Sequence, residues 1–378
     1  MSSQQRLRAA TLADAPAVAA LISGMGFRPR SAAAWRWLFE ENPARAEYDV
    51  PPDIGWVLED GDALLGYLGN VPLSYMLDGK PVRAASCTDY YALPAAGAGG
   101  AGLLRAFFRQ CGVDVFLTTT ANARTAPMYE MFDSVAPPDA SLSEEYVWVA
   151  HDSIALREML AKRGLPPVFA GAVGALVGPV SAQVRALVGF STVPKAVPAA
   201  EITELGPEDI DQRFERLWQG AASSPGLRVR RDSRGVQWYL SNPDAGAVPT
   251  VFAAVEGGEI VGYAAVAANR TADAQIGRLS VLDVLTLPGR ERVIPALLER
   301  TVMHARKMQL GFVYARPCGI SLAPHFRALQ PRVQRFDQPM FYFRAADRHR
   351  TAELARPGLW DATGLDGDAP LCMDYGPG

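Results

Sequence analysis

A glycine-rich segment between a predicted strand and a predicted helix is the part of this sequence best suited to hold an anion. It reads Leu93-Pro94-Ala-Ala-Gly97-Ala98-Gly99-Gly100-Ala101-Gly102-Leu103-Leu104. A backbone without side chains can come close to a ligand. The free amides at a helix N-terminus are hydrogen-bond donors with a favourable dipole. The segment therefore predicts a cradle for a pyrophosphate group.

Gly97, Gly99 and Gly102 also match the G-x-G-x-x-G pattern of dinucleotide-binding folds. That pattern normally opens an early βαβ unit that has an acidic residue about 20 positions later. Here a predicted hairpin precedes the glycines and no second βαβ unit is apparent, so a nicotinamide or flavin site is disfavoured. A flexible Gly/Ala loop that binds nothing is the remaining structural alternative.

Two motifs make the chain resemble the Gcn-related N-acetyltransferase (GNAT) superfamily. In that family a bulged strand ends near a proline and Gln/Arg-x-x-Gly-x-Gly/Ala leads into a helix; Pro94, Gly100 and Gly102 match, and Gly97 replaces the Gln/Arg. One strand later the family has an Asn and then a helix with Ala, Leu-Tyr and a Gly-Phe end. The matching positions are Asn122, Ala126, Met128, Tyr129 and Phe132.

The resemblance implies that the loop holds coenzyme A and that its pantetheine arm lies between two parting strands. The donor-binding residues it implies are Tyr91, Ala92, Leu93, Gly97, Ala98, Gly99, Gly100, Ala101, Gly102, Leu103, Asn122 and Arg124. By the same resemblance, Tyr129 gives a proton to the leaving thiolate. The alternative is that Tyr129 is a half-buried packing residue.

Attack of an amine on a thioester also needs a stabilised oxyanion and an acceptor for the amine proton. A backbone N–H near Tyr91 to Leu93 could stabilise the oxyanion. Asp89 is the only acid on the predicted strand 82–93 and could accept the proton directly or through water. Side-chain alternation predicts that Asp89, Tyr91 and Leu93 share one face. A structural role for Asp89 stays open, because Asp283 repeats it in the second half of the chain.

The chain repeats itself at an offset between 194 (94 to 288) and 201 (37 to 238) residues. The paired positions are Trp37 and Trp238, Asn42-Pro43 and Asn242-Pro243, Gly66-Tyr67 and Gly262-Tyr263, Asp89 and Asp283, Leu93-Pro94 and Leu287-Pro288, and Ala126-Pro127 and Ala323-Pro324. Their conserved order along the chain indicates a duplicated domain.

The second copy departs from the donor motif. Glu291 replaces the Gln/Arg of the family, Ile294 replaces its first glycine, and Phe326 stands where Tyr129 stands. We therefore expect the first half to bind the donor and the second half to shape the acceptor pocket or to support the fold. The aromatic residues expected either to line an acceptor cleft or to form core are Trp35, Trp37, Trp238 and Tyr239.

Hydrophobic patterns and turn residues predict the elements that position these groups. In the first half we expect strands at 6–10, 55–59, 64–73, 82–93 and 113–119, with helices at 11–23, 32–40, 102–110 and 123–131. In the second half we expect strands at 201–205, 249–255, 259–268, 277–287, 312–315 and 338–343, with helices at 207–219, 290–308 and 321–329. The predicted fold class is mixed α/β, with two tandem GNAT-like domains whose mostly antiparallel sheets are flanked by helices.

The predicted organisation is a donor-binding domain at 1–150, an apolar Pro/Gly-containing linker with a helix at 151–200, a degenerate domain at 201–346 and a tail at 347–378. The length of 378 residues fits two domains at about 150 residues each. The apolar content of 49% and charged content of 20% exclude a disordered chain, and the net charge of −3 disfavours a nucleic-acid partner.

Prolines and glycines interrupt the apolar stretch at 165–190, so no membrane span is predicted there. The four cysteines lack metal-ligand or disulfide spacing, so no metal is expected. The N-terminus lacks an apolar signal core, which predicts a cytoplasmic protein.

The function implied is transfer of an acyl group, in the simplest case acetyl, by direct attack of an amine on the thioester. The co-substrate would be acetyl-CoA or another acyl-CoA, and the acceptor a small-molecule amine such as an amino sugar or a biosynthetic intermediate. Three alternatives stay open. They are transfer from an acyl or peptidyl carrier protein, Fem-type aminoacyl transfer from tRNA, and a non-catalytic binding protein.

Overall fold

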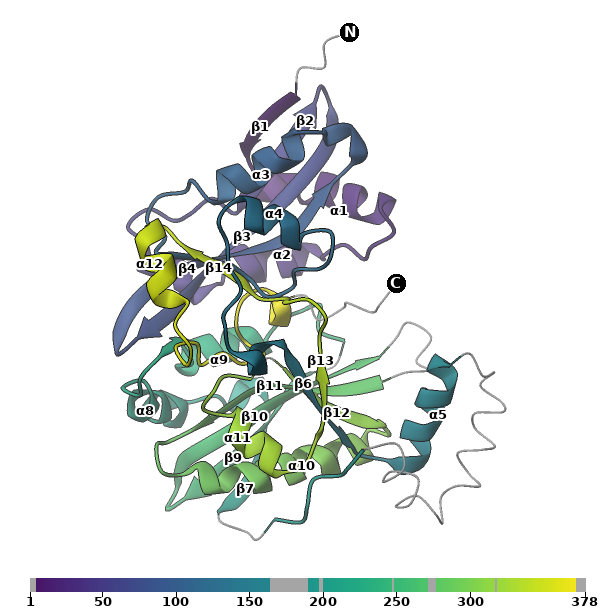
Figure 1. Ribbon diagram of the computed structural model, residues 1–378, viewed down its shortest axis with the longest axis vertical. Coiled ribbons are helices and arrows are strands. Elements are labelled where there is room, and N and C mark those ends of the chain that lie inside the picture. The colour runs from purple at the N-terminus through teal and green to yellow at the C-terminus, as the bar shows by residue number, and fades with distance from the viewer. Residues whose placement is uncertain are drawn as a thin grey trace.

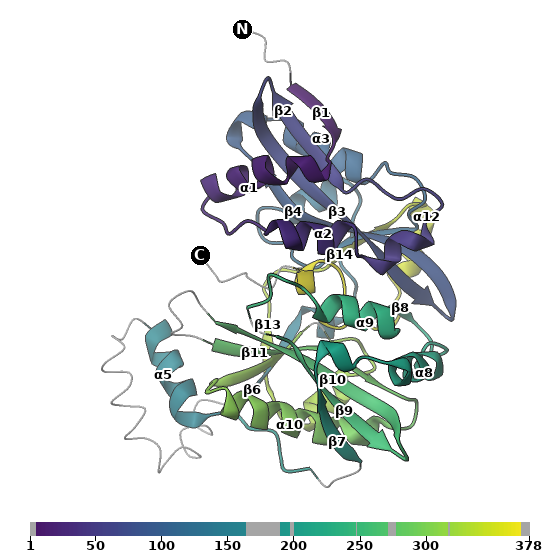
Figure 2. The same ribbon diagram turned by 180° about the vertical axis from the view of Figure 1, so that it is seen from behind.

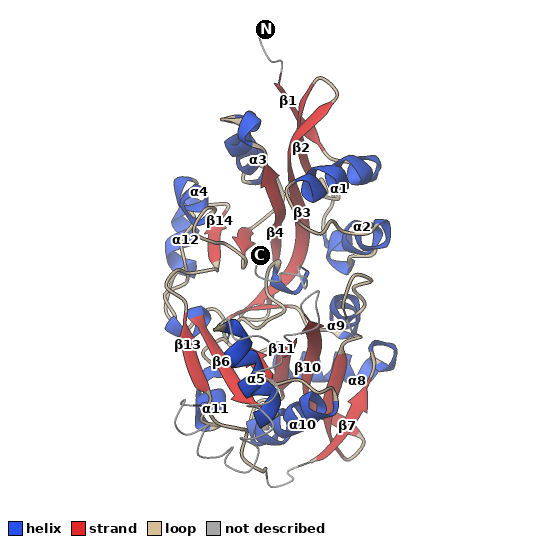
Figure 3. Ribbon diagram, turned by 90° about the vertical axis from the view of Figure 1, so that its right-hand side faces the viewer, coloured by secondary structure: helices blue, strands red, loops and turns tan. Residues whose placement is uncertain are grey.

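The computed structural model describes residues 5–163, 190–196, 200–246, 248–270, 277–316 and 318–371. The helix predicted between 165 and 190 lies outside these residues, and only α5 (Asp152–Lys162) is described at the start of the predicted linker. The described chain forms two bodies, each built on a seven-stranded mixed sheet with helices on both faces (Figures 1 and 3). The predicted mixed α/β class and its two domains are confirmed. In the described ranges no helix is both long and apolar enough to cross a membrane.

The first sheet has the order β1-β2-β3-β4-β5-β14, and β8 also pairs with β3. Its strands are β1 (Gln5–Ala9), β2 (Gly55–Asp60), β3 (Ala63–Leu77), β4 (Lys80–Ala92), β5 (Val115–Thr118), β8 (Leu227–Val229) and β14 (Tyr342–Ala345). Only β4 and β5 run parallel. One face carries α1 (Ala15–Gly24) and α2 (Ala32–Phe39), and the other carries α3 (Gly99–Phe107) and α4 (Ala126–Met131) (Figure 3).

The second sheet has the order β13-β6-β12-β11-β10-β9-β7. Its strands are β6 (Glu144–Val149), β7 (Glu201–Leu205), β9 (Thr250–Glu256), β10 (Glu259–Arg270), β11 (Gly277–Thr286), β12 (Phe312–Ala315) and β13 (Arg332–Arg335). Its helices are α8 (Gln212–Ala221), α9 (Ser233–Leu240), α10 (Ile294–Lys307) and α11 (Ala323–Ala328). In both halves a hairpin, a long strand, a helix and a parallel strand follow one another, as the repeat predicts.

The two halves exchange strands. β6 comes from the first half but pairs with β12 and β13 in the second sheet. β14 comes from the second half but pairs with β5 in the first sheet. Each sheet therefore contains a strand from the other side of the domain boundaries that the sequence suggests at residues 150 and 201. The strand predicted at 338–343 begins and ends later in the sequence, as β14. The sequence patterns did not predict β6, β13 or α9.

A tryptophan pair joins the two halves where α2 meets α9 (Figure 2). The rings of Trp37 and Trp238 stack with their centroids 5.0 Å apart. Each indole N–H donates to the backbone carbonyl of the other tryptophan, at 2.9 and 3.0 Å. These equivalent residues of the repeat thus make an almost symmetric contact. Both are buried, which favours the core interpretation over an open acceptor cleft.

Residues 348–371 belong to the folded part of the chain, although the sequence suggests a tail from 347. α12 (Arg348–Leu354) packs on β14, and the residues that follow run between the two sheets (yellow in Figure 1). We call residues 359–371 the C-terminal segment. Its Trp360 is fully buried against Tyr75, Phe341 and Phe343.

A buried carboxylate in the C-terminal segment predicts pH-dependent stability. Burial raises the pKa of Asp366 to about 7, and its Oδ1 has no described hydrogen-bond partner. Because the folded state favours the protonated form, its contribution to stability is present below the unfolded pKa of about 3.9 and is lost as the pH rises through 7. Asp366→Asn should therefore raise the Tm at about pH 8 and change it much less at about pH 4. Calorimetry at both pH values checks this; an equal shift at both would contradict it.

Candidate active site

A gap in the first sheet opens between the two parallel strands. β4 and β5 pair only from Ala84 with Val115 to Ser86 with Leu117. Beyond Ser86, β4 continues to Ala92 without β5 beside it. A register shift against β3 marks a bulge there, and Asp89 within it has a left-handed φ of 50°. The bulge bends the strand, so the two strands diverge towards the glycine-rich loop.

The loop after β4 presents free backbone donors at the end of this gap. α3 begins at Gly99, so the predicted start at 102 is wrong and Gly100 and Gly102 lie in its first turn. In the described part of the chain, no group accepts a hydrogen bond from the amides of Ala98, Gly99 or Ala101. Gly97 and Ala98 are exposed. The loop therefore presents free backbone donors to solvent at the place where the sequence predicts an anion cradle.

The four glycines of the loop have different reasons to be glycine. Gly97 has a φ of 50°. A Cβ on Gly99 would lie 2.5 Å from the Leu58 side chain. On Gly100 and Gly102 it would meet nothing closer than 3.5 and 4.0 Å. The positive φ therefore explains why residue 97 is glycine, and the close packing of Leu58 explains why residue 99 is glycine. Neither a positive φ nor a close contact requires glycine at Gly100 or Gly102.

One amide of β4 points into the gap. The N–H of Leu93 donates to Leu65 O of β3 at 2.9 Å. In an antiparallel pair, successive residues direct their amides alternately towards and away from the partner strand. The amide of Ala92, the residue before, therefore faces the edge that β5 has left. Of the predicted range Tyr91 to Leu93, Ala92 is the position suited to stabilise an oxyanion.

Tyr129 of α4 lies where the strands part. Its hydroxyl donates to Cys87 Sγ on β4 at 3.3 Å. The residue is 4% exposed, and burial raises the pKa of the phenol well above 10. The phenol therefore keeps its proton at neutral pH and can donate it to a base in the gap.

Tyr90 also lines the gap, on the side of α3 and α4, and sequence reasoning missed it. Its hydroxyl donates to Gly100 O at 3.1 Å and lies 3.6 Å from Met128 Sδ. The alternation prediction placed Asp89, Tyr91 and Leu93 on one face, but the bulge at Asp89 interrupts that pattern. Tyr91 packs instead against Phe27, with centroids 5.3 Å apart.

Asn122 and Arg124 are both exposed at the start of α4. The Asn122 Oδ1 accepts from the amides of Arg124 and Thr125, at 2.9 and 3.3 Å. This Asx-type turn sets the direction of α4 and thereby the position of Tyr129. Asn122 thus has a structural task in this chain.

Asp89 is ion-paired rather than free. Arg30 Nε lies 2.5 Å from its Oδ2, and each side chain is 10% exposed. In the second half, Asp283 pairs with Arg231 at 3.1 Å and accepts a hydrogen bond from Tyr263. Both arginines stand directly before the N-cap of the equivalent helices, α2 and α9. An Arg–Asp pair at each bulge favours the structural role that the sequence left open.

The second copy has the same gap, but its own chain fills it. β11 and β12 pair only up to Val281 and Ala315. The C-terminal segment enters there: Gly319 N–H donates to Ala362 O at 2.6 Å. A Cβ on Gly364 would lie 2.6 Å from Leu282 O. No space for an acyl donor is left at this place.

The loop after β11 is also occupied by the protein itself. The Gly289 N–H donates to the Glu291 carboxylate at 3.0 Å, so a side-chain anion takes the place that a phosphate would need. Phe326 is buried and packs edge-on against Trp148, with no hydroxyl to donate. These contacts support the prediction that the first half alone binds a donor.

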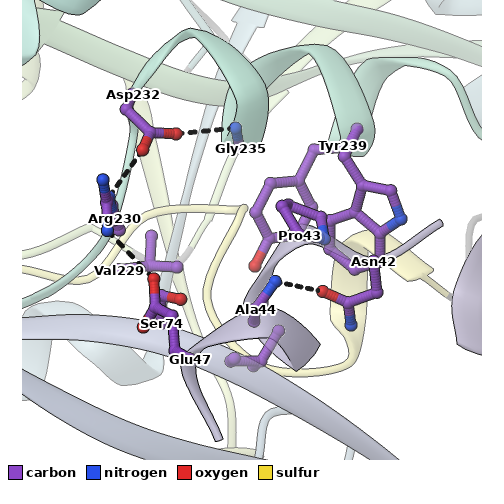
Figure 4. A pocket seen from close by; sticks show the side chains of 12 residues that line it. Asn42, Pro43, Ala44, Glu47, Ser74, Val229, Arg230, Asp232, Gly235 and Tyr239 are labelled. Atoms are coloured by element: carbon purple, nitrogen blue, oxygen red, sulfur yellow. Dashed lines mark hydrogen bonds and ion pairs between the residues drawn. The ribbon is translucent and has the colours of Figure 1, made fainter. Parts of the chain in front are cut away.

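A small pocket lies between the halves, away from the glycine-rich loop (Figure 4). Ser74 of β3, one of the lining residues, pairs with Arg83 near the end of β4 that is opposite to the loop. The lining residues are Asn42, Pro43, Ala44, Glu47, Leu73, Ser74, Val229, Arg230, Asp232, Gly235, Trp238 and Tyr239. Arg230 contacts Glu47 at 2.9 Å and Asp232 at 2.5 Å. The three charged side chains of the lining, Glu47, Arg230 and Asp232, are thus paired with one another, and the lining offers a ligand no unpaired charge.

Comparisons by sequence give no relatives: no protein-family model and no curated protein matches the chain. Comparison of structures gives many. A GCN5-related N-acetyltransferase from Anabaena variabilis aligns with a TM-score of 0.59 at 12% identity, covering 93% of this chain and 75% of that one. One from Kribbella flavida gives 0.55 at 13%, covering 93% and 74%. The Saccharomyces cerevisiae N-myristoyltransferase, with myristoyl-CoA bound, gives 0.55 at 13%, covering 91% and 83%.

Proposed function

Because the chain has two copies of the GNAT fold, we propose that its first half binds an acyl-coenzyme A and transfers the acyl group to an amine. The observation that carries the proposal is the set of unpartnered amides at Ala98, Gly99 and Ala101 beside the gap that holds Tyr129. The N-myristoyltransferase of the same fold has an acyl-CoA bound. We propose acetyl-CoA or another acyl-CoA as donor and a small-molecule amine as acceptor.

The amides of the loop would bind the donor pyrophosphate. Their number and the helix dipole of α3 suit a doubly charged group. Because Gly100 and Gly102 have no side chains, phosphate oxygens could approach their backbone closely. Gly97 provides no side-chain contact, so we expect the affinity for the donor to rest on the main chain. Arg124, which is exposed two residues before α4, is the side chain proposed to contact the donor.

The reaction would take place in the gap. The thioester carbonyl lies against the Ala92 N–H, which stabilises the oxyanion when the amine attacks. Tyr129 then gives its phenolic proton to the leaving sulfur. Arg30 already forms an ion pair with the Asp89 carboxylate. We therefore propose that water accepts the amine proton and that Asp89 stabilises the bulge in β4.

Removing one loop amide tests the donor site. Ala98 has a φ of −65°, which proline can adopt, so Ala98→Pro deletes only an N–H. A lost hydrogen bond to a charged group costs about 1.5 kcal/mol, so the Kd for coenzyme A should rise by about tenfold. Titration calorimetry with coenzyme A and acetyl-CoA measures this.

Ala98→Ser is the matched control, because it keeps the amide and should leave the Kd unchanged. Thermal unfolding of both variants checks that the fold is kept. If the wild-type protein showed no heat of binding and no rise in Tm with either ligand, the proposed donor would be wrong.

A further inference from the structure

The gap between β4 and β5 is covered at the place where the strands begin to part. Cys87 on β4 and Thr118 on β5 each directly follow the last pair of the two strands. Cys87 Sγ accepts a hydrogen bond from the Tyr129 hydroxyl at 3.3 Å. The Thr118 hydroxyl donates to Asp368 Oδ1 at 3.2 Å. We call the place formed by Cys87, Thr118, Tyr129 and Asp368 the closed end of the gap.

The C-terminal segment is tied to both of the strands that part. Asp368 accepts a hydrogen bond from the Thr119 amide at 2.7 Å, one residue past the end of β5. Three residues later, Leu371 O accepts from Arg30 Nη1 at 2.7 Å. Arg30 in turn is paired with Asp89 in the bulge of β4. Through these contacts the segment connects the end of β5 with the bulge of β4.

The C-terminal segment is also held firmly at this place. The second carboxylate oxygen of Asp368 accepts a hydrogen bond from the Thr120 hydroxyl. The Thr119 hydroxyl donates to Asp366 O at 3.0 Å and accepts from the Ala369 amide at 3.0 Å. Moving the segment aside would break these hydrogen bonds together, so the closed end is part of the folded structure.

The closed end leaves little space for a bound group. Three of its four residues are 1% exposed, and Tyr129 is 4% exposed. Because a side chain that lined a roomy cavity would have surface within reach of water, the described residues leave almost no room for methylene groups there. Nearer the loop, Tyr90 and Ala92 are only half-buried. The gap is therefore open towards the loop and filled by protein at its other end.

We propose that the closed end restricts the donor to short acyl groups and that Cys87 sets the limit. The inference rests on the proposed function, in which Tyr129 protonates the leaving sulfur. Since the Tyr129 hydroxyl contacts Cys87, a thioester within reach of the phenol lies close to that thiol. An acyl chain that continued along the gap would have to displace packed side chains, which is unfavourable in a dense interior.

Binding of a series of donors to the full chain tests this proposal without knowledge of the acceptor. Titration calorimetry compares coenzyme A with acetyl-, propionyl-, butyryl- and octanoyl-CoA. The Kd should stay similar up to a limiting chain length and should be higher by about tenfold or more for octanoyl-CoA than for acetyl-CoA. Equal Kd values for these two would overturn the inference and leave the proposed function standing. If none of the five bound, the proposed function would be wrong and the inference with it.

Cys87→Ala tests which residue sets the limit. It removes the thiol and leaves room for about one methylene, so the Kd should begin to rise at a chain about one carbon longer than in the wild type. The matched control is Cys318→Ala, because Cys318 is also 1% exposed but belongs to the second half. This control should leave the limit unchanged.

The same limiting length in Cys87→Ala and in the wild-type protein would overturn the role of Cys87. Thermal unfolding identifies a variant that does not fold. The wild-type series tests the restriction to short acyl groups independently of both variants.

Discussion

Replacing Tyr129 with phenylalanine is expected to lower kcat for acyl transfer by about 10²- to 10⁴-fold, the usual contribution of a general acid. The phenol lies at the parting of β4 and β5 and holds its proton at neutral pH because burial raises its pKa. Phenylalanine keeps the ring that stacks on Tyr342, with centroids 6.2 Å apart, and removes only the hydroxyl. Release of the coenzyme A thiol measures the rate.

Tyr342→Phe is the matched control for this prediction. Its hydroxyl donates to the Glu130 carboxylate at 3.0 Å, whereas the Tyr129 hydroxyl donates to Cys87 Sγ on β4, so the loss of the Tyr342 hydroxyl should change kcat little. The Kd for coenzyme A should be the same in both variants, because the loop amides are untouched. Unchanged turnover in Tyr129→Phe would remove the phenol from the mechanism.

Arg231→Met is expected to lower the free energy of unfolding by about 3–5 kcal/mol, the usual effect of leaving one charge of a buried pair alone. Arg231 and Asp283 are each 1% exposed, and Arg231 Nη1 lies 3.1 Å from Asp283 Oδ1. Methionine fills much of the same volume but leaves the carboxylate without its cation. Urea unfolding followed by tryptophan fluorescence measures the loss.

The double variant Arg231→Met/Asp283→Asn should recover a large part of that loss, because no isolated charge remains. The equivalent pair in the first half provides a comparison. Arg30 and Asp89 are each 10% exposed, so water can solvate a remaining Asp89 and Arg30→Met should cost less. A loss below about 1 kcal/mol in Arg231→Met, the size typical of surface pairs, would contradict the prediction.

The glycine-rich loop, the repeat and the order of elements could be predicted because their signals are local. A strand ending at Pro94, a run of small residues and a helix each leave a pattern within a few positions. The aspartate at each bulge could also be found by matching the two halves. Its arginine partner could not, because neither Arg30 nor Arg231 carries a motif of its own.

The strand exchange had no comparable signal. β6 reads Glu144-Glu145-Tyr-Val-Trp-Val and is buried along its whole length, although it begins with two acids. Arg327 and Arg335 neutralise Glu144 at 2.6 and 3.1 Å, and both come from far along the chain. The contacts of Asp368 with Thr118 to Thr120 are equally distant in sequence. Partners of this kind follow from the tertiary fold and not from local spacing.

The exchange of β6 and β14 has a consequence for the order in which the protein is made. The first sheet lacks its edge strand until the ribosome has produced residues 342–345, and the end of β5 lacks Asp368 for longer still. Small domains usually fold as units while translation continues, beginning at the N-terminus. Here the first sheet cannot be completed before part of the second half has been made, so a nascent chain cannot complete the sheet that contains the gap until residues 342–345 have left the ribosome.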